Sequence, residues 1–339
     1  MSRSFLKNNE KTRSLLIPSG TSIIELLQGA DAFISGQEIS NLLGISRAAV
    51  WKKILTLRNK GYVIEALPSK GYCLKSAPDL AHDYLLMQIK SDLWKDIIIH
   101  GSVESTNDLA MSLATKGEIP PGRVLIADHQ TRGKGRLGRT WESPAGANIY
   151  MSLIIRPELE PKDTTMLTIL AGVAGALALQ RSCSIPVSIK WPNDLVIADK
   201  KLGGILTEVR ADPDRVALAV IGIGINVNME YKGLPEVIRN IATSVKIETG
   251  KNHPRNGIII QLLREFELWY TILKKKGKKP LLDAWRKNSS TLGRKVNVAM
   301  QHVSFSGIAE DIDDNGMLVL KMRSGERKTI SSGDISFLP

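Results

Sequence analysis

The sequence has few cysteines and lacks a hydrophobic run long enough to cross a membrane. Its two cysteines, Cys73 and Cys183, lie far apart and in no metal-ligand spacing. This excludes a disulfide framework and a zinc site, and it fits a reducing cytoplasm. The longest apolar run, Met166–Leu179, is shorter than the roughly 18 residues of a transmembrane helix, so it predicts a buried core helix and no membrane partner. The first residues lack the apolar segment of a secretory signal.

The composition is that of a soluble globular protein. Hydrophobic residues make up 43% of the chain and charged residues 24%, which excludes fibrous and wholly disordered classes. A chain of 339 residues is too long for one ordinary domain. The net charge is +12, and residues 1–78 carry half of this excess, with eleven Lys or Arg against five Asp or Glu. Such a basic segment indicates either a polyanionic partner or a device for solubility, and charge alone leaves both open.

The first quarter of the chain has the pattern of a winged helix-turn-helix. Residues 1–20 are polar and basic and predict a mobile tail. A short helix over Gly36–Gly44 ends at a glycine, and Ser46 caps a further helix that runs to about Lys60. A small hairpin with a basic tip follows. The DNA-binding candidates are the helix-turn-helix Gly36 to Leu55, with Arg47, Lys52 and Lys53, and the wing residue Lys70.

Turn, wing and charge together favour DNA binding over a module for protein contacts. The helix that Ser46 caps is the third, after a short helix that begins near Thr21, and it can enter a major groove because its outer face is basic and its early residues are small. The wing residue Lys70 can reach a phosphate.

From Pro78 onward strands and helices alternate, which predicts an α+β fold with a partly antiparallel sheet. The strand candidates are Ile97–His100, Val124–Asp128, Ile149–Ile155, Val187–Lys190, Leu195–Ala198, Ile205–Arg210 and Val216–Val227. The helix candidates are Asn107–Lys116, Thr165–Arg181 and Ile258–Lys276. After about Ser289, short strands joined at Asn315-Gly316 predict a β-barrel too small to hold a site of its own. These strands are Lys295–Ala299, Phe305–Ile312, Met317–Met322 and Lys328–Ile330.

The stretch Gln130–Thr140 resembles two phosphate-binding patterns without meeting their structural context. It contains G-x-G-x-x-G and differs by one residue from a Walker A loop, but Pro144 and its neighbours prevent a helix from beginning there. What remains is a loop with three glycines and four cations: Arg132, Gly133, Lys134, Gly135, Arg136, Gly138 and Arg139. Backbone N–H groups and cations on one loop suit two anions that must react, and the alternative is a mobile surface loop.

Three other segments place polar or small residues where a ligand can approach. Ser105–Asn107 begins a helix, where an anion is favoured. Lys190–Asp194 follows a strand and ends in Asn-Asp, whose oxygens suit Mg²⁺. Lys201–Gly204 carries two glycines that allow close packing. Each segment also has an interpretation without a ligand. The first is then a helix cap, the second a turn and the third a β-bulge.

In this order, together with Gly222–Asn228, these segments resemble the biotin protein ligases, and the winged helix makes the whole chain similar to their bifunctional ligase–repressor members. The resemblance covers about residues 21–339. It implies a winged-helix DNA-binding domain over 21–78, a mixed-sheet ligase domain over 79–288 and an SH3-like C-terminal domain over 289–339.

The resemblance also implies a reaction in two steps. The carboxylate of biotin attacks the α-phosphorus of MgATP, giving biotinyl-5′-AMP and pyrophosphate. A lysine of the biotin carboxyl carrier protein of acetyl-CoA carboxylase then attacks the mixed anhydride. The family further implies biotin-dependent repression of biotin biosynthesis genes through operator DNA, a homodimer promoted by ligand and a cytoplasmic location. Mg²⁺ would arrive with the nucleotide and not in a dedicated cage.

The family's site residues carry over to positions of this sequence. The catalytic candidates are Lys201, at the reacting carboxylate, and Arg136. The biotin-binding candidates are Ser105, Thr106, Asn107, Gln130, Lys134, Gly135, Arg136 and Lys201. Those associated with ATP and Mg²⁺ are Asn193, Asp194 and Asn226. Lys134 and Leu137 replace arginines of the family loop, and because lysine lacks the bidentate fork of arginine, retention of the adenylate is expected to differ.

Three alternatives stay open at this point. The first is a lipoate ligase or octanoyltransferase, against which the cationic loop and Lys190–Asp194 argue. The second is a biotin sensor without catalysis, against which Lys201 and Arg136 argue. The third is an active ligase whose winged helix no longer regulates, and the sequence does not decide against it.

Overall fold

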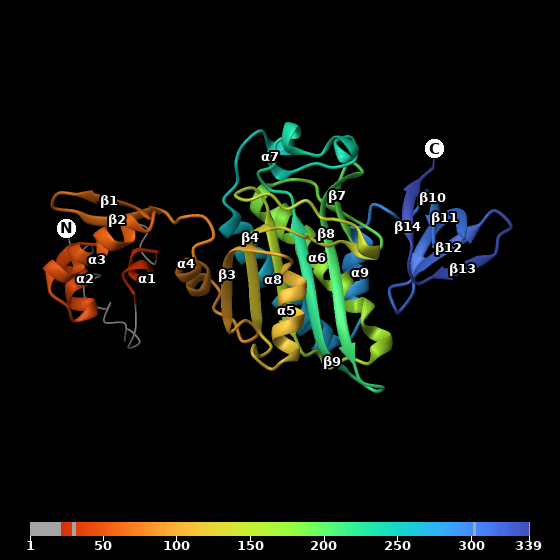
Figure 1. The fold of residues 1–339 in the computed structure, drawn as a ribbon, viewed down its shortest axis with the longest axis horizontal. Helices are drawn as coiled ribbons and strands as arrows, with labels where there is room; N and C mark the ends of the chain where they lie inside the picture. The colour runs from red at the N-terminus through yellow and green to blue at the C-terminus, as the bar shows by residue number, and fades with distance from the viewer. Residues whose placement is uncertain (1–21, 29–31, 301–302, 339) are drawn as a thin grey trace, which may run out of the picture. The chain divides into compact units, whose positions relative to one another are not determined.

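The computed structural model describes residues 22–28, 32–300 and 303–338 (Figure 1). The chain divides into two compact units, the first ending at Tyr84 and the second beginning at Leu85. The tail predicted over residues 1–20 lies outside the described residues.

The first unit consists of short helices followed by a hairpin. Ser35 and Ser46 cap the second and third helices by accepting hydrogen bonds from the N–H groups of Glu38 and Ala49, and Gly44 ends the second helix with φ of 64°. This confirms the helix-turn-helix. The elements are α1 (Ile23–Gln28), α2 (Gly36–Leu43), α3 (Arg47–Asn59), β1 (Val63–Leu67) and β2 (Gly71–Ser76).

The hairpin β1–β2 is fixed beside its turn by a close backbone contact. Ile34 and Tyr72 exchange two backbone hydrogen bonds, of 2.9 and 2.8 Å. Gly71 adopts φ of 108°, and a Cβ atom on it would lie 2.0 Å from the carbonyl oxygen of Ile34. Only glycine fits both constraints, so the position of the wing follows from this residue.

A seven-stranded mixed sheet is the centre of the second unit. Its strand order is β3-β4-β5-β9-β8-β7-β6. The pair β3–β4 is parallel, and the other neighbours are antiparallel, which confirms the predicted α+β class. The strands are β3 (Asp96–Val103), β4 (Arg123–Gln130), β5 (Ile149–Ile155), β6 (Ser188–Lys190), β7 (Asp194–Ile197), β8 (Lys200–Ala211) and β9 (Val216–Ile225).

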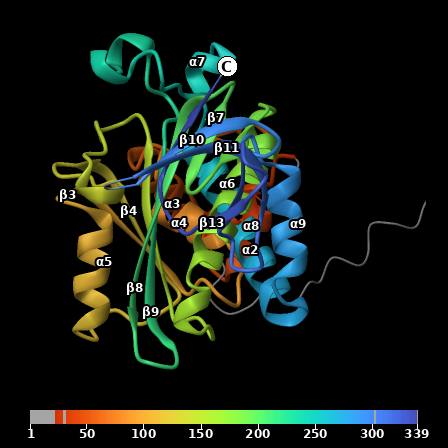
Figure 2. The ribbon, with the colours of Figure 1, turned by 90° about the vertical axis from the view of Figure 1, so that its right-hand side faces the viewer.

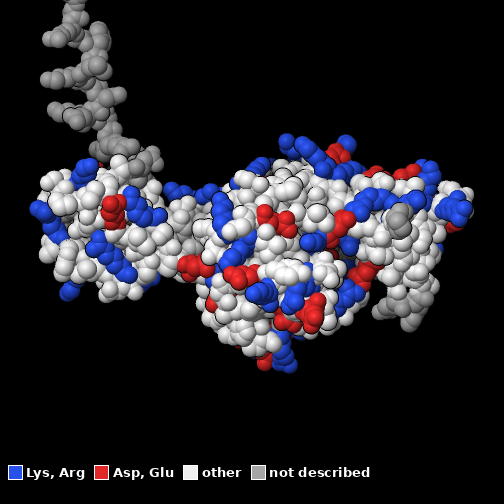
Figure 3. Space-filling view, turned by 90° about the horizontal axis from the view of Figure 1, so that it is seen from above, with Lys and Arg blue, Asp and Glu red and all other residues white. Residues whose placement is uncertain are grey.

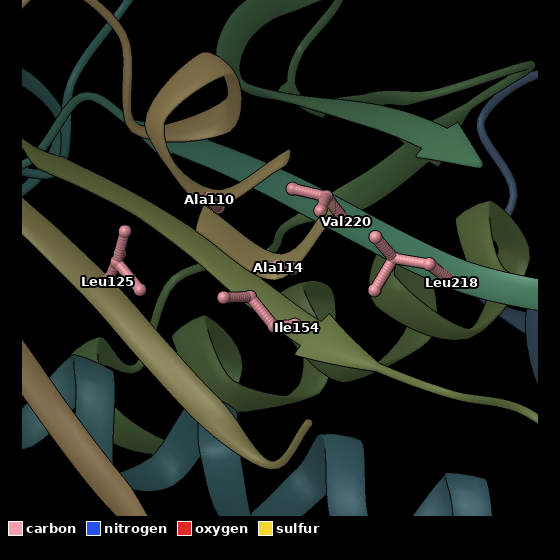
Figure 4. Close-up of a cluster of buried hydrophobic side chains, with 6 residues drawn as sticks. All are labelled: Ala110, Ala114, Leu125, Ile154, Leu218 and Val220. Carbon is pink, nitrogen blue, oxygen red and sulfur yellow. The ribbon is translucent and has the colours of Figure 1, made fainter. Parts of the chain in front are cut away.

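Helices cover both faces of this sheet (Figure 2). On one face α5 packs through Ala110 and Ala114 against apolar side chains of β4, β5 and β9 (Figure 4). On the other face lies α6, which in turn packs against α8 and α9. The α-helices of this part are α4 (His82–Gln88), which contains the division between the units, α5 (Thr106–Thr115), α6 (Thr165–Cys183), α7 (Val245–Thr249), α8 (Arg255–Lys276) and α9 (Lys279–Lys287). The 3₁₀ helices are η1 (Arg136–Gly138), η2 (Pro161–Asp163), η3 (Tyr231–Gly233) and η4 (Glu236–Ile238).

Helix α6 carries the longest apolar run of the sequence. The segment Pro161–Cys183 is long and apolar enough to cross a membrane, but 72% of its most apolar window is buried inside the protein. Both faces of the helix are used, because it lies between the sheet and α8. The prediction of a buried core helix over Met166–Leu179 is therefore confirmed.

The C-terminal part is a five-stranded antiparallel sheet with the order β13-β12-β11-β10-β14. The predicted turn at Asn315-Gly316 joins β11 to β12, and Gly316 has φ of 73°. The indole N–H of Trp191 donates a 3.1 Å hydrogen bond to the carbonyl of Gly316, which ties this sheet to the turn that follows β6 of the seven-stranded sheet. The strands are β10 (Lys295–Ala299), β11 (Ser304–Ile312), β12 (Leu318–Met322), β13 (Arg327–Ile330) and β14 (Asp334–Phe337).

Candidate functional site

A cavity of about 740 Å³ in the second unit brings together all the residues that the sequence predicted for the ligase site. Its walls come from the N-terminus of α5, the ends of β4 to β9, the glycine-rich loop and β14. The predicted residues in its lining are Ser105, Thr106, Asn107, Gln130, Lys134, Gly135, Arg136, Asn193, Asp194, Lys201 and Asn226.

Hydrogen bonds fix the side chain of Gln130 against the start of α5. Its Oε1 accepts from the backbone N–H and the hydroxyl of Thr106, at 2.9 and 3.1 Å. Its Nε2 donates to the hydroxyl of Ser143 at 2.9 Å. Ser105 is the N-cap of α5 and is almost fully buried. The amide of Gln130 is thereby oriented without a ligand, as a preformed polar wall requires.

Asn107 also lines the cavity, and its side-chain amide is hydrogen-bonded to other residues of the protein. Its Nδ2 donates to the carbonyl of Leu206 and to Glu208 Oε2, at 3.1 and 2.8 Å. The hydroxyl of the fully buried Ser152 donates to its Oδ1 at 2.7 Å. A Cβ atom on Gly222 would lie 2.3 Å from that same oxygen. Asn107 therefore shapes the pocket, and the glycine leaves the room that its amide needs.

The glycine-rich loop leaves β4 and returns on itself before β5. Its ends are held by a 2.9 Å hydrogen bond from the N–H of Trp141 to the carbonyl of Gly133, and by one of 2.7 Å from Gly135 to Arg139. The tip is the 3₁₀ turn η1, where Leu137 has φ of 55° and is 66% exposed. No α-helix begins within these loop residues, which confirms that neither phosphate-loop pattern applies.

Each cation of the loop contacts a partner on another segment. Burial lowers the pKa of Arg136, whose guanidinium donates a 3.0 Å hydrogen bond to Asn193. The hydrogen bond from Arg139 to Asp334 raises the pKa of Arg139. The pairs are Arg132 with Glu104, Lys134 with Asp108, Arg136 with Asn193, and Arg139 with Asp334. The loop is thus tied across the cavity, to α5 on one side and to β14 on the other.

Lys201 lines the cavity from β8. Its Nζ lies 2.7 Å from Asp194 Oδ1, and its backbone is held by a 2.7 Å hydrogen bond to the carbonyl of Ile241. The side-chain amides of Asn193 and Asn226 donate to the carbonyls of Ile205 and Thr243, at 2.7 and 3.0 Å. The first of these hydrogen bonds joins the turn before β7 to β8, and the second joins the end of β9 to the segment before α7.

Trp141 forms a wall that the sequence did not predict. Its indole lies over the backbone of Gly204 and Gly224, and a Cβ on Gly224 would lie 2.7 Å from Nε1. Its ring centroid is 5.4 Å from Lys201 Nζ. Two glycines on neighbouring strands indicate that a large side chain packs over them. This can be inferred only when the register Gly204↔Gly224 is known. Further lining residues to which the sequence assigned no role include Tyr150, Met151, Lys190, Asp334, Ile335 and Ser336.

The predicted DNA-binding residues of the first unit are exposed. Arg47, Lys52 and Lys53 lie on α3, and Lys70 lies at the tip of the hairpin. The opposite side of α3 is buried through Val50 and Ile54. Lys and Arg are spread over the face of this unit that Figure 3 shows. The unit therefore has the basic outer helix that docking into a major groove requires.

Comparison with known proteins gives matches over most of the chain. Family models match as the biotin/lipoate A/B protein ligase family over residues 100–226, an HTH domain over 21–73 and the biotin protein ligase C terminal domain over 291–338. The chain is 40% identical to the bifunctional ligase/repressor BirA of Bacillus subtilis, over 92% of this chain and 97% of the relative. It is 34% identical to the protein of the same name from Escherichia coli, over 93% and 95%.

A solved structure is also similar. The biotin protein ligase from Aquifex aeolicus in complex with biotin and ATP superimposes with a TM-score of 0.62 at 30% sequence identity. The similarity covers 72% of this chain and 99% of that protein.

Proposed function

The chain belongs to the family of bifunctional biotin ligase/repressors, and from this premise we propose that it activates biotin with ATP, transfers it to a carrier-protein lysine and represses biotin biosynthesis genes. The observation that carries the ligase is the single cavity that collects every predicted site residue. The match to a biotin/lipoate family model alone leaves both acids open, and the named relatives favour biotin.

In the first step the ring system of biotin lies against Gln130 and the start of α5, and its carboxylate points to Lys201. A carboxylate oxygen then forms a bond to the α-phosphorus of ATP. Lys201 and Arg136 draw the two anions together and stabilise the charge that develops between them, which is often the largest catalytic contribution. No covalent enzyme intermediate is needed, so the site requires no nucleophilic side chain.

The residues near the phosphates fit a Mg²⁺ ion that arrives on the nucleotide. Asp194 offers a carboxylate, whereas the side-chain oxygen of Asn193 already accepts a hydrogen bond from Arg136. One carboxylate together with substrate phosphates is a common Mg²⁺ environment. When bound, the ion would neutralise phosphate charge. Asp194 and Asn226 supply polar groups to the cavity lining near the phosphates.

In the second step the amine of a carrier lysine attacks the acyl carbon of biotinyl-5′-AMP, and AMP leaves with the electron pair of the broken acyl–oxygen bond. The glycine-rich loop, with Lys134, Gly135 and Arg136, keeps water from this labile anhydride until the carrier arrives. Its ties to Asp108, Asn193 and Asp334 hold it across the cavity.

For the repressor we assign DNA contact to α3 and the wing, and ligand-promoted dimerisation to the ligase part. A single winged helix makes few phosphate contacts, so two copies on a palindrome bind far better. We propose domain limits at 21–78, 79–288 and 289–339, and a cytoplasmic location.

The test is transfer of biotin to a purified biotin carboxyl carrier domain in the presence of ATP. We expect one biotin on the acceptor lysine and none on a carrier whose lysine is changed to arginine. Transfer of lipoate in place of biotin would move the chain to the lipoate ligases, and no transfer of either acid would overturn the ligase assignment.

A further inference from the structure

Lys190 is a partly buried cation in the cavity to which the reaction above gives no role. It is the last residue of β6 and lines the cavity. Burial lowers the pKa of its ammonium group, against the opposing effect of Asp194, Asp199 and Asp334. Placing a cation where water is scarce costs free energy, and that cost is offset only by an anion or an equivalent partner.

The protein supplies Lys190 with an aromatic face in place of an ion pair. Its Nζ lies 5.0 Å from the ring centroid of Phe337 on β14. Within the described part of the chain no carboxylate forms a salt bridge with it, whereas Lys201 contacts Asp194 and Arg139 contacts Asp334. The ring orients the ammonium without neutralising it, so its charge is available to a ligand.

The strand order fixes where along the cavity this charge acts. Gln130, at the proposed biotin pocket, is on β4, and Lys201 is three strands away on β8. Asp194 begins β7, and Lys190 on the outer strand β6 is its register partner. Lys201 and Lys190 therefore flank one carboxylate, and Lys190 lies on the side away from the biotin pocket.

We propose that the Lys190 ammonium binds the β- and γ-phosphates of ATP and stabilises the pyrophosphate leaving group. The inference rests on the proposed function, which places the biotin carboxylate at Lys201. Lys190 lies two strands beyond Lys201 in the sheet order, on the side where the phosphates of ATP would continue. It makes Lys190 a catalytic residue of the first step alone, with Phe337 as the residue that positions it.

The charge balance of the step explains the need for a cation at this place. As the carboxylate oxygen binds the α-phosphorus, the bond from that phosphorus to the oxygen bridging the α- and β-phosphates breaks. The electron pair stays on the bridging oxygen, and no proton is transferred. Negative charge therefore develops on the pyrophosphate, and a positioned ammonium lowers the energy of that state.

The test separates the two half-reactions in the full-length protein. Lys190→Met removes the charge at similar length, Lys190→Arg keeps it, and Lys200→Met is the matched control, since Lys200 is exposed and outside the cavity lining. We expect Lys190→Met to slow biotin-dependent exchange of labelled pyrophosphate into ATP by about 100-fold, as for loss of one electrostatic donor, and to raise the KM for pyrophosphate. Lys190→Arg retains most of the exchange, and Lys200→Met retains all of it.

Transfer from preformed biotinyl-5′-AMP to the carrier domain is the internal reference, because that step involves no pyrophosphate. It should run at the parent rate in Lys190→Met, which also shows that the variant is folded. An equal loss in both half-reactions, or unchanged exchange, would overturn the assignment of Lys190. Failure of the parent protein itself to exchange would overturn the proposed function instead.

Discussion

Lys201 is the residue whose removal should act most directly on chemistry. It is held in the cavity wall by its ion pair with Asp194 and by backbone hydrogen bonds. Lys201→Ala is expected to slow adenylate formation by about 100-fold, like the loss of one oxyanion donor. Single-turnover formation of biotinyl-5′-AMP measures this. A near-normal rate would remove Lys201 from the catalytic residues.

Arg136 should act on retention of the intermediate. Its hydrogen bond to Asn193 ties the tip of the glycine-rich loop to the turn between β6 and β7. Arg136→Gly is expected to leave the fold intact and to release biotinyl-5′-AMP, seen as biotin on lysines of a bystander protein. Arg132→Gly is the control, because Arg132 pairs with Glu104 and does not line the cavity. If Arg136→Gly holds the intermediate as tightly as the parent, the loop is not its lid.

At the level of residues, the sequence predicted which side chains line the site better than it predicted which residues they contact. The polar and glycine positions of the site were visible because they interrupt apolar strands, and the family resemblance assigned them roles. Lys190 belonged to a recognised segment but had no role, since its place depends on the register with Asp194. Trp141 was missed for the same reason: the two glycines that accommodate it are neighbours only in the sheet.

Among the elements, the packing of α5 on β9 offers a test of how the biotin pocket is supported. Gly222→Ala places a methyl group against Asn107 Oδ1 and should break the bonds of that amide to Leu206 and Glu208. Overpacking of this kind costs about 1–3 kcal/mol, so denaturant unfolding should show a loss of that size together with weaker biotin binding. Gly101→Ala is the control, because nothing lies within 4 Å of its Cβ position. Equal behaviour of the two variants would contradict this account of the pocket.

Most strands of both sheets were predictable, including the short β6, β7 and β13, whereas α9 and β14 were not. The strands β5 and β10 were predicted with the bounds that the structure has. Helix α9 was missed because Pro280 and flanking lysines hide a short apolar face. Strand β14, of four residues, was also missed. That omission mattered, because β14 forms one wall of the cavity. The C-terminal β-domain, predicted to be too small for a site of its own, therefore contributes to the site of the larger sheet.

At the scale of the whole molecule, repression controlled by biotin requires the two activities to be linked. We expect biotin with ATP to order the glycine-rich loop and neighbouring strand ends, and thereby to shift the protein from monomer or weak dimer to a tight dimer in sedimentation. Operator affinity should rise in step, and its logarithm should fall steeply with the logarithm of salt concentration. Operator binding that ignores biotin and ATP, with normal ligase activity, would leave the ligase and remove the regulation.

The central claim is that this cavity joins biotin to AMP. Exchange of labelled pyrophosphate into ATP by the purified full-length protein tests it most directly, because it reports the first step without a carrier or DNA. The account predicts rapid exchange that depends on biotin and is absent with lipoate or octanoate. Exchange supported by lipoate, or no exchange with biotin, would contradict it.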